Sequence, residues 1–253
     1  MMSRSGIRRV LSIVIFFVLW YLFTSVVKVP YLSNVPPIVD VVREGISYLP
    51  TSKYLTNFLF TLARVFLGFI LGAAIGIPFG VVMGWKKRFK WLAFPLFEFL
   101  RPIPILAWMP LSVIMFTKTE YSISFLIFLG AFFPIALNTY HGVSTISIEQ
   151  VRAAQSLGSK GKDVLFKVIL PAASSAIYTG LTIAIGLTWV VVVAAEMVSG
   201  GYGLGYMTWE AYILLKYCRI IVGMFSIGAA GWLCSSIIRK IADKAMPWRK
   251  IFG

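Results

Sequence analysis

Charged side chains within apolar stretches are the residues of this sequence most suited to chemistry, since a charge in such surroundings is costly and often functional. Arg64 and Arg101 are the two cations, and Glu98 and Glu196 are acids within or near similar stretches. One hypothesis is that the arginines line a pathway and favour an anion. The alternative is structural pairing, of Arg64 with Glu196 and of Arg101 with Glu98 or a helix-end carbonyl. Thr188 and Trp189, near the middle of the fifth apolar stretch, are further candidates. The candidate pathway residues are thus Arg64, Arg101, Thr188, Trp189 and Glu196.

Side chains for covalent catalysis or metal binding are sparse. His141 is the single histidine, and Cys218 and Cys234 fit no metal or redox spacing. Segment 158–163 lacks the first glycine and the final Ser or Thr of a phosphate loop, and the Gly-Tyr-Gly-Leu-Gly run at 201–205 follows no strand, so a flexible turn is expected there. The 9 acidic residues are scattered, which argues against an enzyme acting on lipid. We predict no catalytic and no metal site.

The composition indicates a membrane protein. Hydrophobic residues make up 59% of the 253 residues and charged residues 13%, whereas soluble domains have about 45–50% and about 25%. The net charge of +15 does not indicate nucleic-acid binding, because basic residues of membrane proteins collect in cytoplasmic loops. We therefore predict a multi-pass protein of the inner or plasma membrane that contacts lipid.

Six apolar stretches predict six membrane helices, since a crossing needs about 20 apolar residues. The third contains four prolines and must be broken or curved, which only protein or a water-filled cavity can accommodate. The first follows several arginines without a cleavage site, so we expect an uncleaved signal-anchor helix and outer loop in 1–35 and a core domain in 36–253. The stretches are 10–27, 58–85, 91–116, 121–140, 171–198 and 220–238.

The distribution of basic residues predicts the orientation. With the N-terminus inside, 16 of the 24 Lys and Arg residues fall in inside segments and 6 fall outside. Basic residues favour the cytoplasmic side, so both termini are predicted to be cytoplasmic.

The second apolar stretch carries a glycine at every fourth position. Such spacing makes a groove along one helix face, where another helix can approach closely. The sequence leaves open whether that helix belongs to this chain or to a second copy. No internal repeat is visible, so a central pathway is expected to need a second subunit. The glycines are Gly68, Gly72, Gly76, Gly80 and Gly84.

The longest inside loop follows the fourth apolar stretch. Ser147 and Gln150 form a capping box that predicts a helix, and Gly158 is placed to end it in the left-handed conformation. Ser159 can cap a second short helix before the next span, which is expected to start at Pro171. The first helix either docks in a groove of another protein or rests on the ends of the bundle; its pattern is compatible with both.

This loop resembles the cytoplasmic "EAA" signature of ABC importer permeases. The family pattern is Glu-Ala-Ala, three residues, Gly, nine residues, Ile, one residue, Leu-Pro. The segment 152–158 begins Arg-Ala-Ala and ends in Gly, and Val168 and Leu170-Pro171 complete the spacing. Arg152 replaces the usual Glu and Val168 the usual Ile. The resemblance extends over about 36–238, where the strings at 100–104, 130–134, 137–140 and 195–197 resemble the nitrate/sulfonate/taurine/bicarbonate branch.

The resemblance implies an all-α permease of the type I importer class, with six spans and a coupling helix-turn-helix between the fourth and fifth. It implies a homodimer, a separate ABC ATPase subunit that binds the ATP for which this chain has no phosphate loop, and an extracytoplasmic binding protein. The implied substrate is a small anion such as a sulfonate, nitrate or bicarbonate; a heterocyclic vitamin precursor and, as a different class, a self-sufficient secondary transporter are the alternatives. The implied coupling residues are Glu149, Arg152, Ala153, Ala154, Gly158, Leu170 and Pro171.

Overall fold

The computed structural model describes residues 4–27, 34–199 and 201–246, in which every regular element is a helix. Besides the α-helices there are two π-helical turns, η1 and η4, and one 3-10 turn, η3. The elements in chain order are α1 (Arg4–Tyr21), η1 (Leu22–Val26), α2 (Ile38–Tyr48), α3 (Ser52–Trp85), α4 (Lys87–Leu100), η3 (Ile105–Trp108), α5 (Met109–Met115), α6 (Thr119–Ser144), α7 (Ile148–Ser156), α8 (Lys162–Val164), η4 (Leu165–Ile169), α9 (Leu170–Ser199), α10 (Leu204–Ile213) and α11 (Tyr217–Ala245).

Within the described residues, four helical segments are long and apolar enough to cross a membrane: α3, α6, the continuous run Lys162–Ser199 and α11. The third predicted span is a pair, α4 and η3–α5, bent by 94°, and counting it gives five. The break follows from Pro102 and Pro104, which cannot continue a helix. The first predicted span corresponds to α1 and η1, whose apolar part, Val14–Val26, is shorter than the other four. The structure thus supports four or five of the six predicted spans.

The glycines of α3 pack against α6, which decides the question that the sequence left open. A Cβ added at Gly68 would overlap Ile127, and one at Gly72 would overlap Ala131. A Cβ at Gly80 or Gly84 would likewise overlap Thr139 or Val143, and one at Gly76 would lie in tight contact with Ile135 at 3.2 Å. The groove along α3 is therefore filled by a helix of the same chain. On its other side α6 packs against α9, where Gly180 lies against Asn138, so α3, α6 and α9 form the packed body of the protein.

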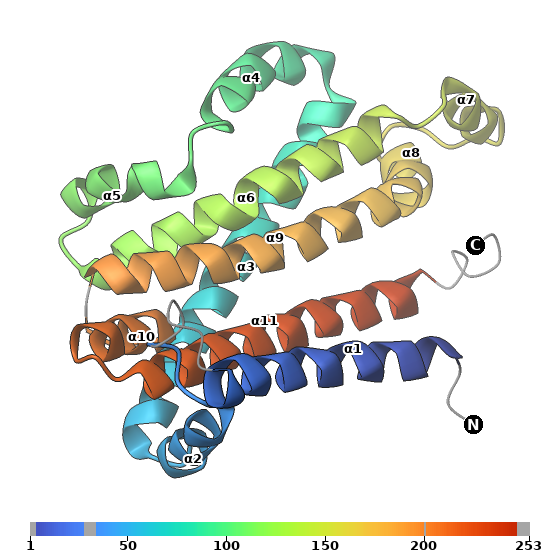
Figure 1. Ribbon diagram of the computed structural model, residues 1–253. Helices are drawn as coiled ribbons and strands as arrows, with labels where there is room; N and C mark the ends of the chain where they lie inside the picture. Colours follow the sequence, from blue (N-terminus) through green and yellow to red (C-terminus); the bar gives the residue numbers. More distant parts are fainter. Residues whose placement is uncertain (1–3, 28–33, 200, 247–253) are drawn as a thin grey trace.

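The other helices surround this body. Helices α1 and α11 lie side by side, with Trp20 and Phe225 stacked at 5.9 Å, while α4 and α5 form an arm beside α6 (Figure 1). The start of α1, the end of α11 and α7 lie at one end of the molecule, and α2 and α10 lie towards the other (Figure 1). Two parts of the sequence predictions lie outside the described residues. They are the cations Arg249 and Lys250, counted among the inside residues, and segment 28–33, next to the predicted domain boundary at 35.

Candidate functional site

An ion-pair cluster joins α3, α6 and α9 at the end of the molecule opposite α7; Arg64 and Glu196 are buried in it, whereas the Glu120 side chain is 53% exposed. The Arg64 side chain is only 5% exposed, and its Nη1 donates to Oε1 of the fully buried Glu196 at 2.8 Å. Its Nε donates to Oε2 of Glu120 at 2.8 Å, and its Nη2 pairs with Oε1 of the same carboxylate. Thr61 Oγ1 donates to Glu196 Oε1 at 2.8 Å. The pairing of Arg64 with Glu196 considered from the sequence is the geometry found.

The same cluster holds the turn at 201–205, between α9 and α10. Gly203 N donates to Asn57 Oδ1 at 2.7 Å, and Gly205 N donates to Glu196 Oε2 at 2.9 Å. Arg64 Nη1 donates to the Tyr202 carbonyl at 2.6 Å. Gly203 has a φ of +128°, and a Cβ there would overlap the Glu196 carboxyl group. The expectation of a turn was right, but the expectation that it is flexible was wrong, because buried side chains of α3 and α9 fix its backbone.

The charge balance of this cluster bears on the anion-pathway hypothesis. Each of the three guanidinium nitrogens of Arg64 donates to a partner within the protein. Two carboxylates surround the one cation, so the cluster carries an excess of negative charge when all three are ionised. Such a cluster is suited to fixing helices and a turn. The sequence analysis did not identify Asn57, Thr61 and Glu120 as members of this cluster. Asn57 and Thr61 could have been found, because their spacing of three and four residues puts them on the helix face of Arg64.

Arg101 lies in different surroundings, at the break between α4 and η3. Its Nη2 lies 3.3 Å from Glu98 Oε2, and the two side chains are 39% and 37% exposed. Arg101 is therefore paired with Glu98, as the structural alternative proposed, but both side chains of this pair are accessible to solvent. An accessible charge on a broken span remains able to contact a solute.

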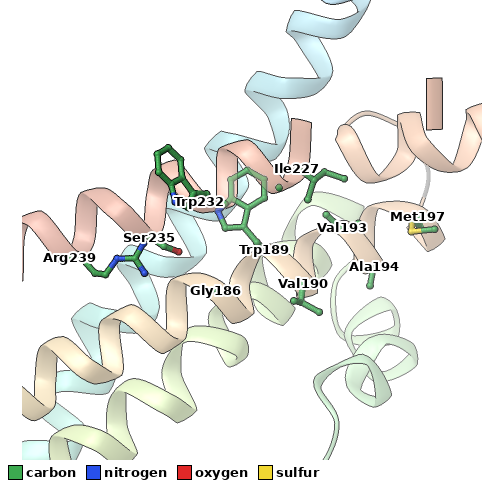
Figure 2. A pocket seen from close by; sticks show the side chains of 12 residues that line it. Gly186, Trp189, Val190, Val193, Ala194, Met197, Ile227, Trp232, Ser235 and Arg239 are labelled. Carbon is green, nitrogen blue, oxygen red and sulfur yellow. The ribbon is translucent and has the colours of Figure 1, made fainter. Parts of the chain in front are cut away.

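The two mid-span candidates are placed in α9. Thr188 is fully buried, and its hydroxyl donates to the Ile185 carbonyl at 2.8 Å. Trp189 is nearly buried and lines a groove between α9 and α11 (Figure 2). In the described part of the chain no group of three His, Cys, Asp or Glu side chains is arranged to hold a metal ion.

The loop after α6 forms the predicted capped helix, α7. Ser147 Oγ accepts from Gln150 N at 3.4 Å, which confirms Ser147 as the N-cap, the first half of the predicted capping box. Gly158 has a φ of +91° and its N donates to the Gln155 carbonyl at 2.9 Å, as predicted for a glycine that ends a helix. Both ends of α7 are therefore set by local sequence.

The second half of the predicted helix-turn-helix differs from expectation. The next helix starts at Lys162 with Gly161 as the N-cap residue, so the prediction that Ser159 caps it was wrong. Pro171 is the second residue of α9, as expected within one residue for the start of the fifth span, but the helix runs without a break from Lys162 through η4 into α9. The π turn next to Pro171 has a physical reason, since proline has no N–H for the usual backbone hydrogen bond.

Most of α7 faces away from the rest of the chain. Val151 and Ile146 pack against buried residues at the ends of α6 and α9, and they anchor the helix. Figure 1 shows α7 projecting at that end of the molecule. Leu157 is 88% exposed and Ile148 is also exposed. The sequence analysis did not identify Leu157 as a candidate residue. Of the predicted coupling residues, Ala154 and Leu170 are partly buried; the exposed ones are Glu149, Arg152, Ala153, Gly158 and Pro171.

Fold and sequence comparisons define the class of protein. The structure resembles the permease of a methionine ABC transporter in an inward-facing conformation, with a TM-score of 0.54 and 18% identity, covering 71% of this chain and 93% of that chain. This is the type I ABC importer permease fold. The family described as binding-protein-dependent transport system inner membrane component matches residues 76–246, and the chain belongs to that family. It is a multi-pass inner-membrane component of an ABC importer.

Named relatives align with most of the chain. An ABC transporter permease protein of Methanocaldococcus jannaschii is 41% identical over 239 residues, which are 92% of this chain and 89% of the relative. A nitrate import permease protein of Leptolyngbya laminosa is 36% identical, with coverage of 74% and 67%. A bicarbonate transport system permease protein of Synechococcus elongatus is 40% identical, with coverage of 70% and 64%.

Proposed function

We propose that this chain forms the translocation pathway of an ATP-driven importer as one of two identical permease subunits. A separate ATPase subunit binds and hydrolyses ATP, and an extracytoplasmic binding protein delivers the substrate. The termini and α7 face the cytoplasm, because the basic residues gather at that end. Family membership supports this arrangement, and the sequence contains no phosphate loop of its own.

The exposed apolar surface of α7 carries the proposal. A short helix with both ends capped and with Leu157 and Ile148 on its surface is suited to a hydrophobic groove of a partner protein. The partner here is the ATPase, and α7 is the coupling helix. The residues proposed to couple are Glu149, Arg152, Ala153, Ala154 and Gly158 on α7 and the following turn, with Leu170 and Pro171 at the start of α9.

The arm formed by α4 and α5 supports a second copy as partner. Leu92 and Ile114 are each 81% exposed, and the neighbouring Trp91 is exposed as well. Lipid can cover these side chains, but the backbone at the break between α4 and η3 needs protein or a water-filled cavity around it. A second permease that faces this break surrounds its backbone with protein and encloses a water-filled pathway. This arrangement places Arg101 beside the pathway.

A small oxyanion is the proposed substrate class. The relatives named for nitrate and bicarbonate transport support it, and the accessible guanidinium of Arg101 is a suitable contact for such an anion. A heterocyclic vitamin precursor handled by the same permease role is the alternative. Uptake by cells that express the whole importer, with labelled nitrate and bicarbonate offered separately, distinguishes these substrates.

Substitution of the most exposed apolar residue beside α7 tests the coupling role. We expect Leu157→Ser to weaken retention of the ATPase subunit about tenfold or more in co-purification from mild detergent, since loss of an apolar anchor costs more than about 1.4 kcal/mol. The melting temperature of the permease itself should stay unchanged, because Leu157 is 88% exposed.

Ile46→Ser is the matched control. Ile46 is 74% exposed but lies in α2, towards the other end of the molecule, so the ATPase should be retained as in the native protein. Equal retention by Leu157→Ser and the native chain would remove the coupling role from this surface. Failure of the native chain to bind any ATPase would instead favour a self-sufficient secondary transporter.

A further inference from the structure

Four cations gather at the corner where α3 ends and α4 begins. Lys86 is the single non-helical residue between the two helices, with an extended backbone at φ −105° and ψ 107°. Lys87 and Arg88 follow in the first turn of α4, and Lys90 lies one turn after Lys86. Lys86, Lys87 and Arg88 are exposed, whereas Lys90 is half-buried. These four residues are called the corner patch.

No acidic side chain of the described residues pairs with the corner patch. The sequence has no Asp or Glu between Glu44 and Glu98, and Glu98 is paired with Arg101 at the other end of α4. Among the ion pairs of the described residues, none includes a cation of the patch. Four like charges within five residues repel one another, so an anion from outside the chain would stabilise this arrangement.

Contacts with the packed body hold the corner in place. Lys90 Nζ lies 5.3 Å from the centroid of the Tyr140 ring and 5.8 Å from that of the Phe94 ring. Tyr140 is a buried residue of α6. Trp85, the last residue of α3, packs against the same buried cluster as Val151 of α7. The corner patch is therefore fixed at the α7 end of the molecule, where the start of α1 and the end of α11 also lie (Figure 1).

Large apolar side chains follow the cations directly. Trp91 is 76% exposed and Leu92 is 81% exposed, so both need an apolar environment outside the described chain. Tryptophan favours the boundary between the head groups and the hydrocarbon core of a bilayer. Lys and Arg side chains beside this boundary extend to the head groups. The order of residues along the chain thus matches a corner patch at head-group depth, from which α4 leads into the apolar layer.

We propose that the corner patch binds the phosphate groups of anionic phospholipids in the leaflet on the α7 side. Clusters of four or more Lys and Arg residues next to a membrane helix are suited to anionic lipid head groups. The preference of cations for the cytoplasmic side explains their number at this end, but it does not require four of them at one fixed corner without an acid. At the end of α11, by contrast, Asp243 lies between Lys240 and Lys244.

The lipid site is compatible with the partners proposed above. The break near Arg101, where a second copy is proposed to lie, is at the opposite end of the 14-residue helix α4, and a helix of this length spans about 21 Å. Lipid binding at the corner patch requires neither the coupling role of α7 nor the pathway role of Arg101.

Native mass spectrometry of the permease in mild detergent, with added phosphatidylglycerol or phosphatidylcholine, tests the site. We expect the double variant Lys87→Gln/Arg88→Gln to lower retention of phosphatidylglycerol about tenfold or more, since each cation near an anionic surface contributes about fivefold. Retention of phosphatidylcholine should change little, because this lipid has no net charge. The melting temperature without added lipid should equal that of the native protein, because both side chains are exposed.

The matched control is Lys240→Gln/Lys244→Gln, which removes the same charge from the same end of the molecule and should leave retention of phosphatidylglycerol within about twofold of native. Equal retention by Lys87→Gln/Arg88→Gln and the native protein, or an equal loss in the control, would overturn the proposal. Displacement of phosphatidylglycerol by inorganic phosphate would overturn it in favour of a site for a small soluble anion. Retention of the lipid together with loss of the ATPase subunit from Lys87→Gln/Arg88→Gln in co-purification would overturn it in favour of a protein-docking surface.

Discussion

The packed interfaces between α3, α6 and α9 and the open side formed by α4, α5, α11 and the outward face of α9 contain the same kinds of residues in different surroundings. Both have glycines on helix faces, but those of α3 are in contact with α6, whereas Gly186 and Gly228 face empty space. Both have an Arg–Glu pair, but the pair of Arg64 with Glu196 is buried and that of Arg101 with Glu98 is accessible. We propose that the first region maintains the fold and that the second is where other molecules bind.

The two Arg–Glu pairs give the largest expected difference. We expect Glu196→Ala to destabilise the protein by about 3–5 kcal/mol, because it leaves Arg64 without one of its buried partners. Denaturation in mixed micelles with increasing SDS measures this loss. Glu98→Ala is the control, with an expected change of about 0–1 kcal/mol for an accessible pair. Equal losses in the two variants would contradict the division between the two regions.

The two sets of glycines give the next effect. We expect Gly72→Leu to destabilise the protein by about 1–3 kcal/mol, since its side chain would overlap Ala131 of α6. Gly186→Leu has no neighbour to displace within 4 Å, and a change within about 0.5 kcal/mol is expected. Thermal unfolding of both variants in the same detergent provides the comparison. A large loss in Gly186→Leu would mean that the open side is closed in the folded protein.

The last comparison uses Arg101→Gln, which should alter stability by no more than about 1 kcal/mol. Uptake by the assembled importer should nevertheless fall about tenfold or more, because a charged hydrogen-bond donor to the anion is lost. Co-purification of the ATPase shows that assembly is intact. Normal uptake with normal assembly would remove Arg101 from the pathway and leave it with a structural role only.

Local features were predictable from the sequence because their causes are local. Hydropathy over 20 residues identified α3, α6, α9 and α11, and prolines identified the break in the third span. Ser147 and Gly158 defined the ends of α7, since each acts on backbone groups within a few residues. The N-cap at Gly161 was missed because Ser159 was the stronger cap by residue type, while the actual start of that helix depends on how η4 continues into α9.

Contacts between distant segments were decided only by the tertiary structure. The sequence showed that α3 has a glycine groove, but the identity of its partner depends on where α6 lies in space. It named Arg64 and Glu196, but the participation of Glu120 and of the 201–205 turn depends on three helices meeting at one end of the body. Residue type and spacing thus determined the membrane environment, the helices and the family signature. The position of each side chain relative to distant helices determined which glycines and charges are enclosed and which are open to other molecules.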